Sequence, residues 1–336
     1  MLARSALRWS VALGGALVIF GLLMVSKGAS PIEAYRGMWS SIITDTSLAA
    51  ILVKGTPLIL AALAVTIPAR AGLVNVGGEG QLIMGGVFAA GASLALDGRA
   101  PGATGLVVLC LAGALGGALW AGIAAVLRLW VGISEAVTTL LLNYVALNVM
   151  FFLIFDPWKD ANGSGQPATP PIPVSERFPL IGTSAVHQGF LVAVVAAVAV
   201  WWMLARTRLG FKLRVVGGNA EAGRRAGLPV ARLILGAMLL GGALAGLGGA
   251  AHLVGAEFKL RQGFLVSYGY IGFLASWLAR HNPVKVALSA LLLAAISISG
   301  DSLQIDSQLP AATVNVLMAL VLIAVFGFAG RRRAAA

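Results

Sequence analysis

Charged side chains are scarce in this sequence. Only 11% of the 336 residues are Asp, Glu, Lys or Arg, whereas 59% are hydrophobic. An average soluble domain carries about 25% charged residues, so a water-soluble fold of this size is excluded. The 43 glycines are dispersed within the apolar runs, where small residues let membrane helices approach closely. The composition therefore predicts a chain that lies mostly in a lipid bilayer.

Other absences exclude whole classes of chemistry. The one cysteine, Cys110, lies in an apolar segment and cannot form an intrachain disulfide. The sequence has no Gly-x-x-x-x-Gly-Lys-Ser/Thr phosphate loop, so it does not bind ATP in that way. It also lacks a His-Glu-x-x-His helix, a cysteine cluster and a Gly-x-Ser-x-Gly elbow. Nothing in the sequence supports a membrane enzyme, and any chemical energy must come from another polypeptide.

Basic residues outnumber acidic ones by 24 to 12, which gives a formal net charge of +12. A nucleic-acid-binding protein would gather its basic residues on one solvated surface. Here they cluster in the segments between apolar runs, a pattern that follows the positive-inside rule of membrane proteins. A cytoplasmic N-terminus places most basic segments inside, including the arginines at 331–333, and most acidic residues outside.

A membrane-spanning helix needs about 20 mainly apolar residues, and the sequence offers ten candidates. They are residues 9–26, 46–67, 72–96, 102–127, 135–155, 188–205, 233–254, 264–279, 284–299 and 311–328. The first follows Arg4 and Arg8 and is interpreted as a signal anchor, because no small-residue cleavage site follows it. The predicted fold is an all-α integral membrane protein of about ten transmembrane or partly re-entrant helices. Both termini are predicted to be cytoplasmic.

Two connections are longer than ordinary loops. Residues 156–187 contain six prolines and form a predicted external loop that could act as a lid or a docking surface. Residues 206–232 carry seven basic side chains and a single acid, which predicts a cytoplasmic loop. We call these segments the proline-rich loop and the basic loop.

Each half of the chain, on either side of the proline-rich loop, contains a polar, glycine-rich interruption of an apolar run. The interruptions cover residues 75–81 and 262–270. Transporters built from two pseudo-repeated halves place such broken segments around the substrate. Glu79 has two compatible interpretations: it lies on the substrate path, or it caps a broken helix by accepting backbone N–H bonds. The candidate path residues here are Asn75, Glu79, Gln81, Tyr268 and Tyr270.

Polar side chains also mark the fifth candidate span. Thr138, Thr139, Asn143, Tyr144 and Asn148 can share much of one helical face. Hydrogen bonding between helices is the simpler explanation for Thr138 and Asn148. Asn143 and Tyr144 join the candidate path residues. The isolated cations Lys54 and His252 are interpreted as structural, through snorkelling or pairing with Glu79.

The basic loop contains a predicted short helix between residues 217 and 229. Asn219 is a suitable N-cap, Glu221 suits the positive end of the helix dipole, and Gly227 with Pro229 ends the helix. A solvated basic loop attracted to lipid headgroups is the alternative. A capped helix with small residues on one side is better suited to entering a groove on a partner.

Four motifs together resemble the membrane permeases of ABC importers, most closely the branch that serves purine nucleosides. They are GLVNVGGEGQ at 72–81, TLLLNY at 139–144, GNAEAGRRAG at 218–227 and YGYIGF at 268–273. The sequence departs from that branch at Gly223, where alanine is frequent, and at SWLAR in 276–280. Sugar and branched-chain amino acid permeases are related branches. The resemblance implies a single permease domain over residues 1–336 in the cytoplasmic (inner) membrane of a bacterium.

The resemblance also implies the partners and the mechanism. It implies a second permease subunit, identical or homologous, ATPase subunits that bind ATP and Mg²⁺, and an extracytoplasmic substrate-binding protein. Residues 219–228 would form the coupling helix that rests on the ATPase. Its candidate docking residues are Asn219, Glu221, Ala222, Gly223, Arg224, Arg225 and Gly227. The expected function is import of purine nucleosides or related compounds by alternating access.

Two alternatives within the transporter class remain open. The ligand could be a monosaccharide or a branched-chain amino acid, and Lys54 with Glu79 could pair with the charges of a zwitterion. An ion-coupled secondary transporter that works alone is the other alternative. The long basic loop and the scarcity of intramembrane carboxylates argue against it.

Overall fold

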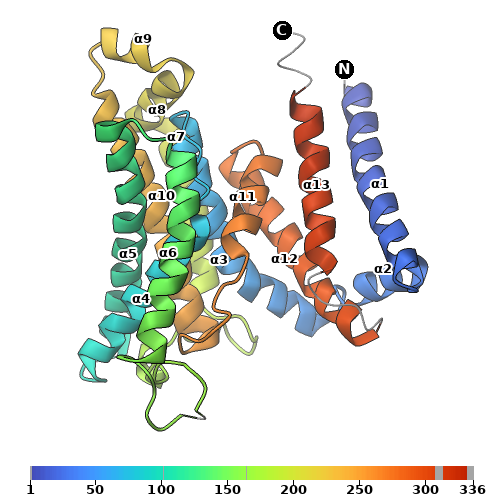
Figure 1. The fold of residues 1–336 in the computed structure, drawn as a ribbon, viewed down its shortest axis with the longest axis horizontal. Helices are drawn as coiled ribbons and strands as arrows, with labels where there is room; N and C mark the ends of the chain where they lie inside the picture. Colours follow the sequence, from blue (N-terminus) through green and yellow to red (C-terminus); the bar gives the residue numbers. More distant parts are fainter. Residues whose placement is uncertain (1, 101, 164, 307–312, 331–336) are drawn as a thin grey trace. The chain divides into compact units, whose positions relative to one another are not determined.

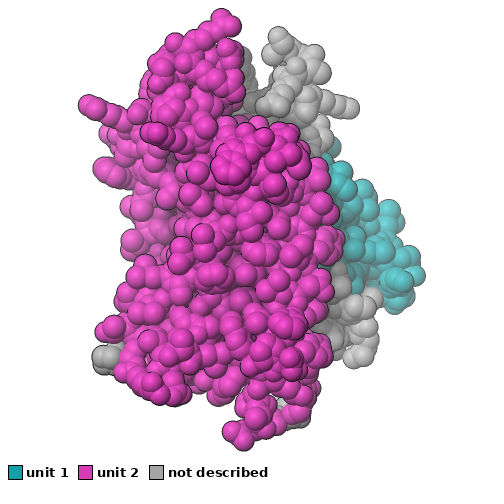
Figure 2. Space-filling view, turned by 60° about the vertical axis from the view of Figure 1, so that its left-hand side comes forward, with its two compact units in different colours: residues 1–51, 292–336 teal, residues 52–291 magenta. Residues whose placement is uncertain are grey.

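A computed structural model describes the whole chain except residues 1, 101, 164, 307–312 and 331–336. The arginines at 331–333 therefore lie outside the described residues. The chain forms two compact units, residues 52–291 in one and residues 1–51 with 292–336 in the other (Figure 2). The described residues contain helices but no strand, only two isolated bridges, Ala168 to Arg261 and Leu180 to His187.

Thirteen α-helices are present in the described chain (Figure 1). They are α1 (Leu2–Ser26), α2 (Pro31–Ser40), α3 (Asp45–Arg70), α4 (Gly78–Leu96), α5 (Gly102–Val131), α6 (Glu135–Phe155), α7 (Gly189–Arg206), α8 (Arg208–Gly218), α9 (Ala220–Arg225), α10 (Val230–His252), α11 (Tyr268–Leu278), α12 (Pro283–Asp306) and α13 (Thr313–Gly330). Among the described residues, seven helices are long and apolar enough to cross a membrane, or up to eight if the bent pair α1 and α2 forms one span. The predicted all-α membrane fold is confirmed.

Glycine packing holds the centre of the 52–291 unit together. Helices α4, α5 and α10 approach so closely that a Cβ on Gly85 would overlap the Gly246 backbone of α10. A Cβ on Gly117 of α5 would likewise overlap the carbonyl oxygen of Gly242. These contacts leave no room for side chains between the backbones, as in small-residue interfaces of other membrane helices. The close packing predicted from the dispersed glycines is confirmed.

Two of the candidate spans differ from ordinary membrane helices. Helix α4 begins at Gly78, so the first residues of the candidate 72–96 form a non-helical segment that precedes the helix. Helix α11 has only 11 residues within the candidate 264–279. Its length of about 16 Å is roughly half the hydrocarbon thickness of a bilayer. Both segments are interrupted near the residues where the sequence turns polar.

The two long loops lie at opposite ends of the 52–291 unit (Figure 1). Helices α8 and α9 belong to the basic loop at one end. At the other end, backbone hydrogen bonds tie the proline-rich loop to the chain that follows α10: Thr169 N–H to Leu260 O at 3.0 Å, Ile172 N–H to Phe258 O at 2.7 Å, and Phe178 N–H to Val254 O at 3.1 Å. These hydrogen bonds hold the proline-rich loop in place at this end of the 52–291 unit.

The side chain of His187, at the end of the proline-rich loop, is buried, and its two ring nitrogens have no hydrogen-bond partner among the described residues. It is 1% exposed, and its ring stacks on Phe178 with 5.7 Å between centroids. Burial, together with the nearby His252, lowers the pKa of His187 from 6.5 to about 4. The imidazole is thus neutral at pH 7, because burial disfavours its charged form.

Acidification is expected to destabilise this end of the protein. Because the folded pKa of His187 lies below its unfolded value, its contribution to stability is complete above pH 6.5 and falls as the pH drops toward 4. The loss between pH 7 and pH 5 is about 2 kcal/mol. Thermal unfolding in detergent should show this loss for the wild type and a weaker pH dependence for His187→Gln. Equal pH dependence in both proteins would contradict the assignment.

Candidate functional site

The two polar interruptions meet in space, at the start of α4 and the start of α11. The Glu79 carboxylate accepts the Ser267 N–H at 2.5 Å through Oε1 and the Gly269 N–H at 2.6 Å through Oε2. A Cβ on Gly78 would lie 3.3 Å from the Gly269 Cα. The first N–H groups of a helix have no partner within it and form its positive end, which a carboxylate satisfies. Glu79 therefore caps α11 from a neighbouring helix.

The capping role of Glu79 leaves little of its carboxylate for other contacts. Its side chain is buried, and both oxygens are engaged by the backbone of α11. A direct contact of Glu79 with substrate stays a prediction. The pairing of Lys54 with Glu79, considered for a zwitterion, likewise stays a prediction.

Asn75 and Gln81 satisfy each other in the buried interior. The Asn75 Nδ2 donates to Gln81 Oε1 at 3.1 Å, and the Gln81 Nε2 donates back to Asn75 Oδ1 at 2.9 Å. The Gly77 N–H also donates to Asn75 Oδ1, at 3.0 Å. Both side chains are essentially inaccessible. This reciprocal pair holds the loop before α4 in one conformation.

Asn143 fastens α6 to that same loop. Its Oδ1 accepts the Gly80 N–H at 2.8 Å, and its Nδ2 donates to the Val76 carbonyl at 3.0 Å. The same Nδ2 lies 3.3 Å from the Tyr270 hydroxyl on α11. One turn earlier, the Thr139 hydroxyl accepts the Val76 N–H at 3.2 Å. The asparagine thus connects three elements: α6, the start of α4 and α11.

The three tyrosines differ in accessibility. Tyr144 is 61% exposed and Tyr270 is 39% exposed. Tyr268 is half-buried, and its ring packs on His252 with 5.4 Å between centroids. Of the seven predicted path residues, only Tyr144 and Tyr270 present an exposed side chain in the isolated chain. The other five side chains are buried or half-buried against neighbouring parts of the protein.

Sequence reasoning missed several residues that complete this structure. The buried Glu135 accepts the Val74 N–H at 2.9 Å and pairs with Arg128. Glu135 follows Ser134 at the start of α6, where acidic residues are common for reasons of helix capping alone. At the far end of α11, the Ser276 hydroxyl lies 2.9 Å from both the Thr66 hydroxyl and the His281 Nδ1. No local sequence signal marks these contacts.

The predicted short helix of the basic loop is present as α9. The Asn219 side chain caps it by accepting the Ala222 N–H at 3.0 Å, and Glu221 pairs with Arg224 at 2.6 Å and with Arg225 at 3.3 Å. Gly227 follows with a left-handed backbone, φ +76°. Gly223 is the buried member of this helix, and a Cβ there would make ordinary contacts with Val216 and Val230. An alanine at this position would therefore fit.

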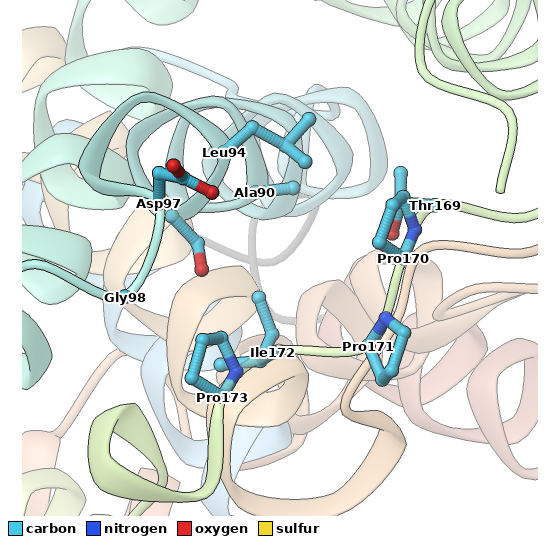
Figure 3. Close-up of a pocket in the computed structure, with 10 residues that line it drawn as sticks. Ala90, Leu94, Asp97, Gly98, Thr169, Pro170, Pro171, Ile172 and Pro173 are labelled. Carbon is cyan, nitrogen blue, oxygen red and sulfur yellow. The ribbon is translucent and has the colours of Figure 1, made fainter.

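Two hollows lie beside the proline-rich loop. One, of about 200 Å³, is formed by the last turns of α4 and the turn after it, from Ala90 to Gly98, and by residues 169–173 (Figure 3). Prolines and Ile172 line much of it, and Asp97 supplies its charged group. The other, of about 300 Å³, is more polar and includes Asp160, Lys259 and Arg261. Neither is lined by the residues that surround Glu79.

A bundle of membrane-spanning helices, with broken segments meeting inside it and a basic loop at one end, is an architecture of transport permeases. Residues 47–326 match the family described as "Branched-chain amino acid transport system / permease component". The chain therefore belongs to this family of ABC transporter permease subunits, as the four motifs indicated.

Similar proteins cover nearly the whole chain. The glucose ABC transporter permease of Haloferax volcanii is 37% identical over 92% of this chain and 83% of its own length. The guanosine ABC transporter permease of Bacillus subtilis is 31% identical over 90% of this chain and 87% of its own. The nucleoside ABC transporter permease of Lactococcus lactis is 27% identical, with 91% and 87% covered.

Membership of this family defines the general role of the chain. It is a multi-span permease subunit of the cytoplasmic membrane and not itself an enzyme. Permeases of ABC transporters work together with ATPase subunits and a substrate-binding partner. The sequence prediction of an ABC transporter permease is confirmed, and the family implies ATPase and substrate-binding partners.

Proposed function

We propose that the chain is the permease of an ATP-driven importer of purine nucleosides or related compounds. The main support is that the carboxylate of Glu79, a residue of this chain, already caps the N-terminus of the short helix α11. In several transporters, such an open helix end binds an anionic group of the substrate. With Glu79 in place, α11 offers no free positive end to a carboxylate or a phosphate. A neutral ligand suits this site better than an amino acid.

The exposed side chains beside this cap suit a nucleoside. Tyr144 and Tyr270 supply aromatic faces and hydroxyl groups, which can contact a planar base and hydrogen-bond to a ribose. Ligand sites typically combine such apolar faces with a few placed polar groups. The guanosine and nucleoside permeases among the similar proteins support the same ligand class.

A monosaccharide is the second candidate. The glucose permease of Haloferax volcanii, at 37% identity, is the observation that favours it. A sugar is also neutral and also packs on aromatic rings, so the capped α11 does not discriminate between the two. A branched-chain amino acid is disfavoured, because its carboxylate would have to compete with Glu79 for α11.

The proposed assembly follows the charge distribution. The basic loop and both termini face the cytoplasm, and α9 rests on an ATPase subunit that binds ATP and Mg²⁺. The proline-rich loop faces outward, where the hollow with Asp160, Lys259 and Arg261 offers both charges to a binding protein. A second permease subunit, identical or homologous, completes the path. ATP-driven movement of α9 would then open the path inward.

Uptake measurements test the ligand. Cells carrying the complete transporter are given radiolabelled guanosine, glucose, ribose or leucine, with cells lacking this chain as the background. Guanosine is expected to accumulate and to be displaced by other unlabelled purine nucleosides. Accumulation of glucose or ribose without accumulation of guanosine would contradict a nucleoside ligand and support a monosaccharide. Accumulation of leucine alone would refute a neutral ligand.

A bulky residue on α9 is expected to disconnect the ATPase. Ala222 is exposed on this helix, so Ala222→Trp should leave the fold intact but prevent α9 from entering a groove on its partner. Ligand-stimulated ATP hydrolysis by the complex should fall at least about tenfold, as for the loss of a contact residue worth more than 1.4 kcal/mol.

Ala185→Trp, an exposed alanine of the proline-rich loop, is the matched control. It adds the same side chain at the opposite end of the unit and should leave copurification of the ATPase unchanged. If Ala222→Trp retains both the ATPase and the stimulation, α9 is not the docking helix.

A further inference from the structure

The last turn of α8 touches the turn after α3, backbone against backbone. A Cβ on Gly217 would overlap the Arg70 carbonyl oxygen and would lie 2.9 Å from the Gly72 nitrogen. Gly72 has a left-handed backbone, φ +77°, and a Cβ there would lie 3.2 Å from the Gly217 Cα. Protein interiors transmit strain where atoms are close-packed without gaps. The basic loop is therefore in direct contact with the segment 70–79.

The segment 70–79 is bound in turn to the start of α11 and to the turn after it. At the N-terminal end, Glu79 accepts the Ser267 and Gly269 N–H groups at 2.5 and 2.6 Å. Just beyond the C-terminal end, in the turn that follows Leu278, the Arg70 Nη2 donates to the His281 carbonyl at 2.8 Å. Arg70 is the same residue whose carbonyl faces Gly217. One short segment thus contacts the basic loop, the start of α11 and the turn after α11.

The segment 70–79 is also held against α6 and α11, which leaves it little freedom to move independently of them. The segment is held to α6 at three successive points, by Glu135, Thr139 and Asn143, through hydrogen bonds of 2.9, 3.2 and 3.0 Å. The contact of Gly78 with Gly269 is again one backbone against another. Coupling between distant sites is carried by contiguous packed and hydrogen-bonded groups of this kind.

We propose that the Gly217–Gly72 contact transmits movement of the basic loop to α11, with Arg70 and Glu79 as the positioning residues that fasten the turn after α11 and the start of α11, respectively. This inference rests on the proposed function, because it takes α9 as the docking helix of the ATPase. Helix α11 carries Tyr270, so the transmitted movement reaches a side chain of the proposed path. ATP binding would then move the path residues through α8 and the segment 70–79.

Two adjacent glycines of α8 give a matched test. A Cβ on Gly217 would meet the turn after α3, whereas no described atom lies within 4 Å of a Cβ on Gly218. Gly217→Ala should copurify with the ATPase and retain basal hydrolysis, but ligand stimulation of hydrolysis should fall at least about fivefold, the lower range of allosteric coupling. Gly218→Ala should behave as the wild type.

Hydrogen exchange supplies a second readout. In the complete wild-type complex, addition of ATP should change the exchange of the peptide 267–278, which contains α11. The change should persist in Gly218→Ala and be lost in Gly217→Ala. If Gly217→Ala does not assemble, Glu79→Gln tests the other end of the connection, because the amide retains only one acceptor oxygen for α11.

The outcomes separate the two proposals. A wild-type response to ligand and ATP that persists equally in Gly217→Ala and Gly218→Ala would refute the connection and leave the proposed function standing. The same holds if Glu79→Gln retains the wild-type exchange response. A purified wild-type complex that shows neither stimulation nor uptake would refute the proposed function, and the connection with it.

Discussion

Glu79→Ala is expected to lower the stability of the purified protein by about 3–6 kcal/mol, because hydrogen bonds to a charged group contribute about 1.5–3 kcal/mol each. The substitution leaves the Ser267 and Gly269 N–H groups without their acceptor at a buried helix end. The expected fall in Tm is on the order of 10 °C, and a loss this large approaches the entire stability of many proteins. Thermal unfolding in detergent and the yield of monodisperse protein measure it.

Glu221→Ala is the control for this experiment. Glu221 is an exposed acid whose ion pairs among the described residues are with neighbouring arginines of α9, so its removal should leave the Tm close to that of the wild type. If Glu79→Ala unfolds at the same temperature as Glu221→Ala, the carboxylate does not hold α11, and its main role would have to be on the substrate path.

Gly246→Ala should be the second severe substitution. A Cβ at this position would overlap the Gly113 carbonyl oxygen and lie 2.8 Å from the Gly117 nitrogen, so α5 and α10 must separate. Overpacking costs about 1–3 kcal/mol even where flexible side chains can adjust, and here the obstacle is backbone. We expect a loss of at least about 3 kcal/mol and little folded protein in the membrane.

Gly236→Ala makes the same chemical change in the same helix. No described atom lies within 4 Å of a Cβ at Gly236, so the only expected effect is the gain in helix propensity, up to about 1 kcal/mol. The two variants should therefore change Tm in opposite directions. Equal Tm values would mean that the α5–α10 approach is looser than described.

The sequence predicted those features that depend on neighbouring residues. Most of the spans were readable from apolar runs, and α9 from its own capping residues, since Asn219 and Gly227 act within a few positions of each other. The same local logic indicated that residues 75–81 and 262–270 interrupt their helices. The sequence did not indicate that these two segments are hydrogen-bonded to each other.

The hydrogen-bond partners of the polar side chains in the site lie far apart in the sequence, so the sequence alone does not identify them. Glu79 and its partner Gly269 are 190 positions apart, and Asn143 is 63 positions from Gly80. A buried polar residue in an apolar run predicts that a partner exists, but not whether the partner is a ligand or the protein's own backbone. For Asn75, Gln81 and Asn143 the described contacts are with the protein itself.

The hydrogen bonds that attach the proline-rich loop determine which of its residues can change during evolution without loss of the loop's shape. Its bonds to the chain after α10 run from backbone N–H to backbone carbonyl, at Thr169, Ile172 and Phe178. Bonds of this kind do not depend on which side chains are present. Exposed positions between them, such as Val174, can therefore vary freely among descendants while the loop keeps its shape. A lineage could adapt this surface to a new partner without refolding the bundle beneath it.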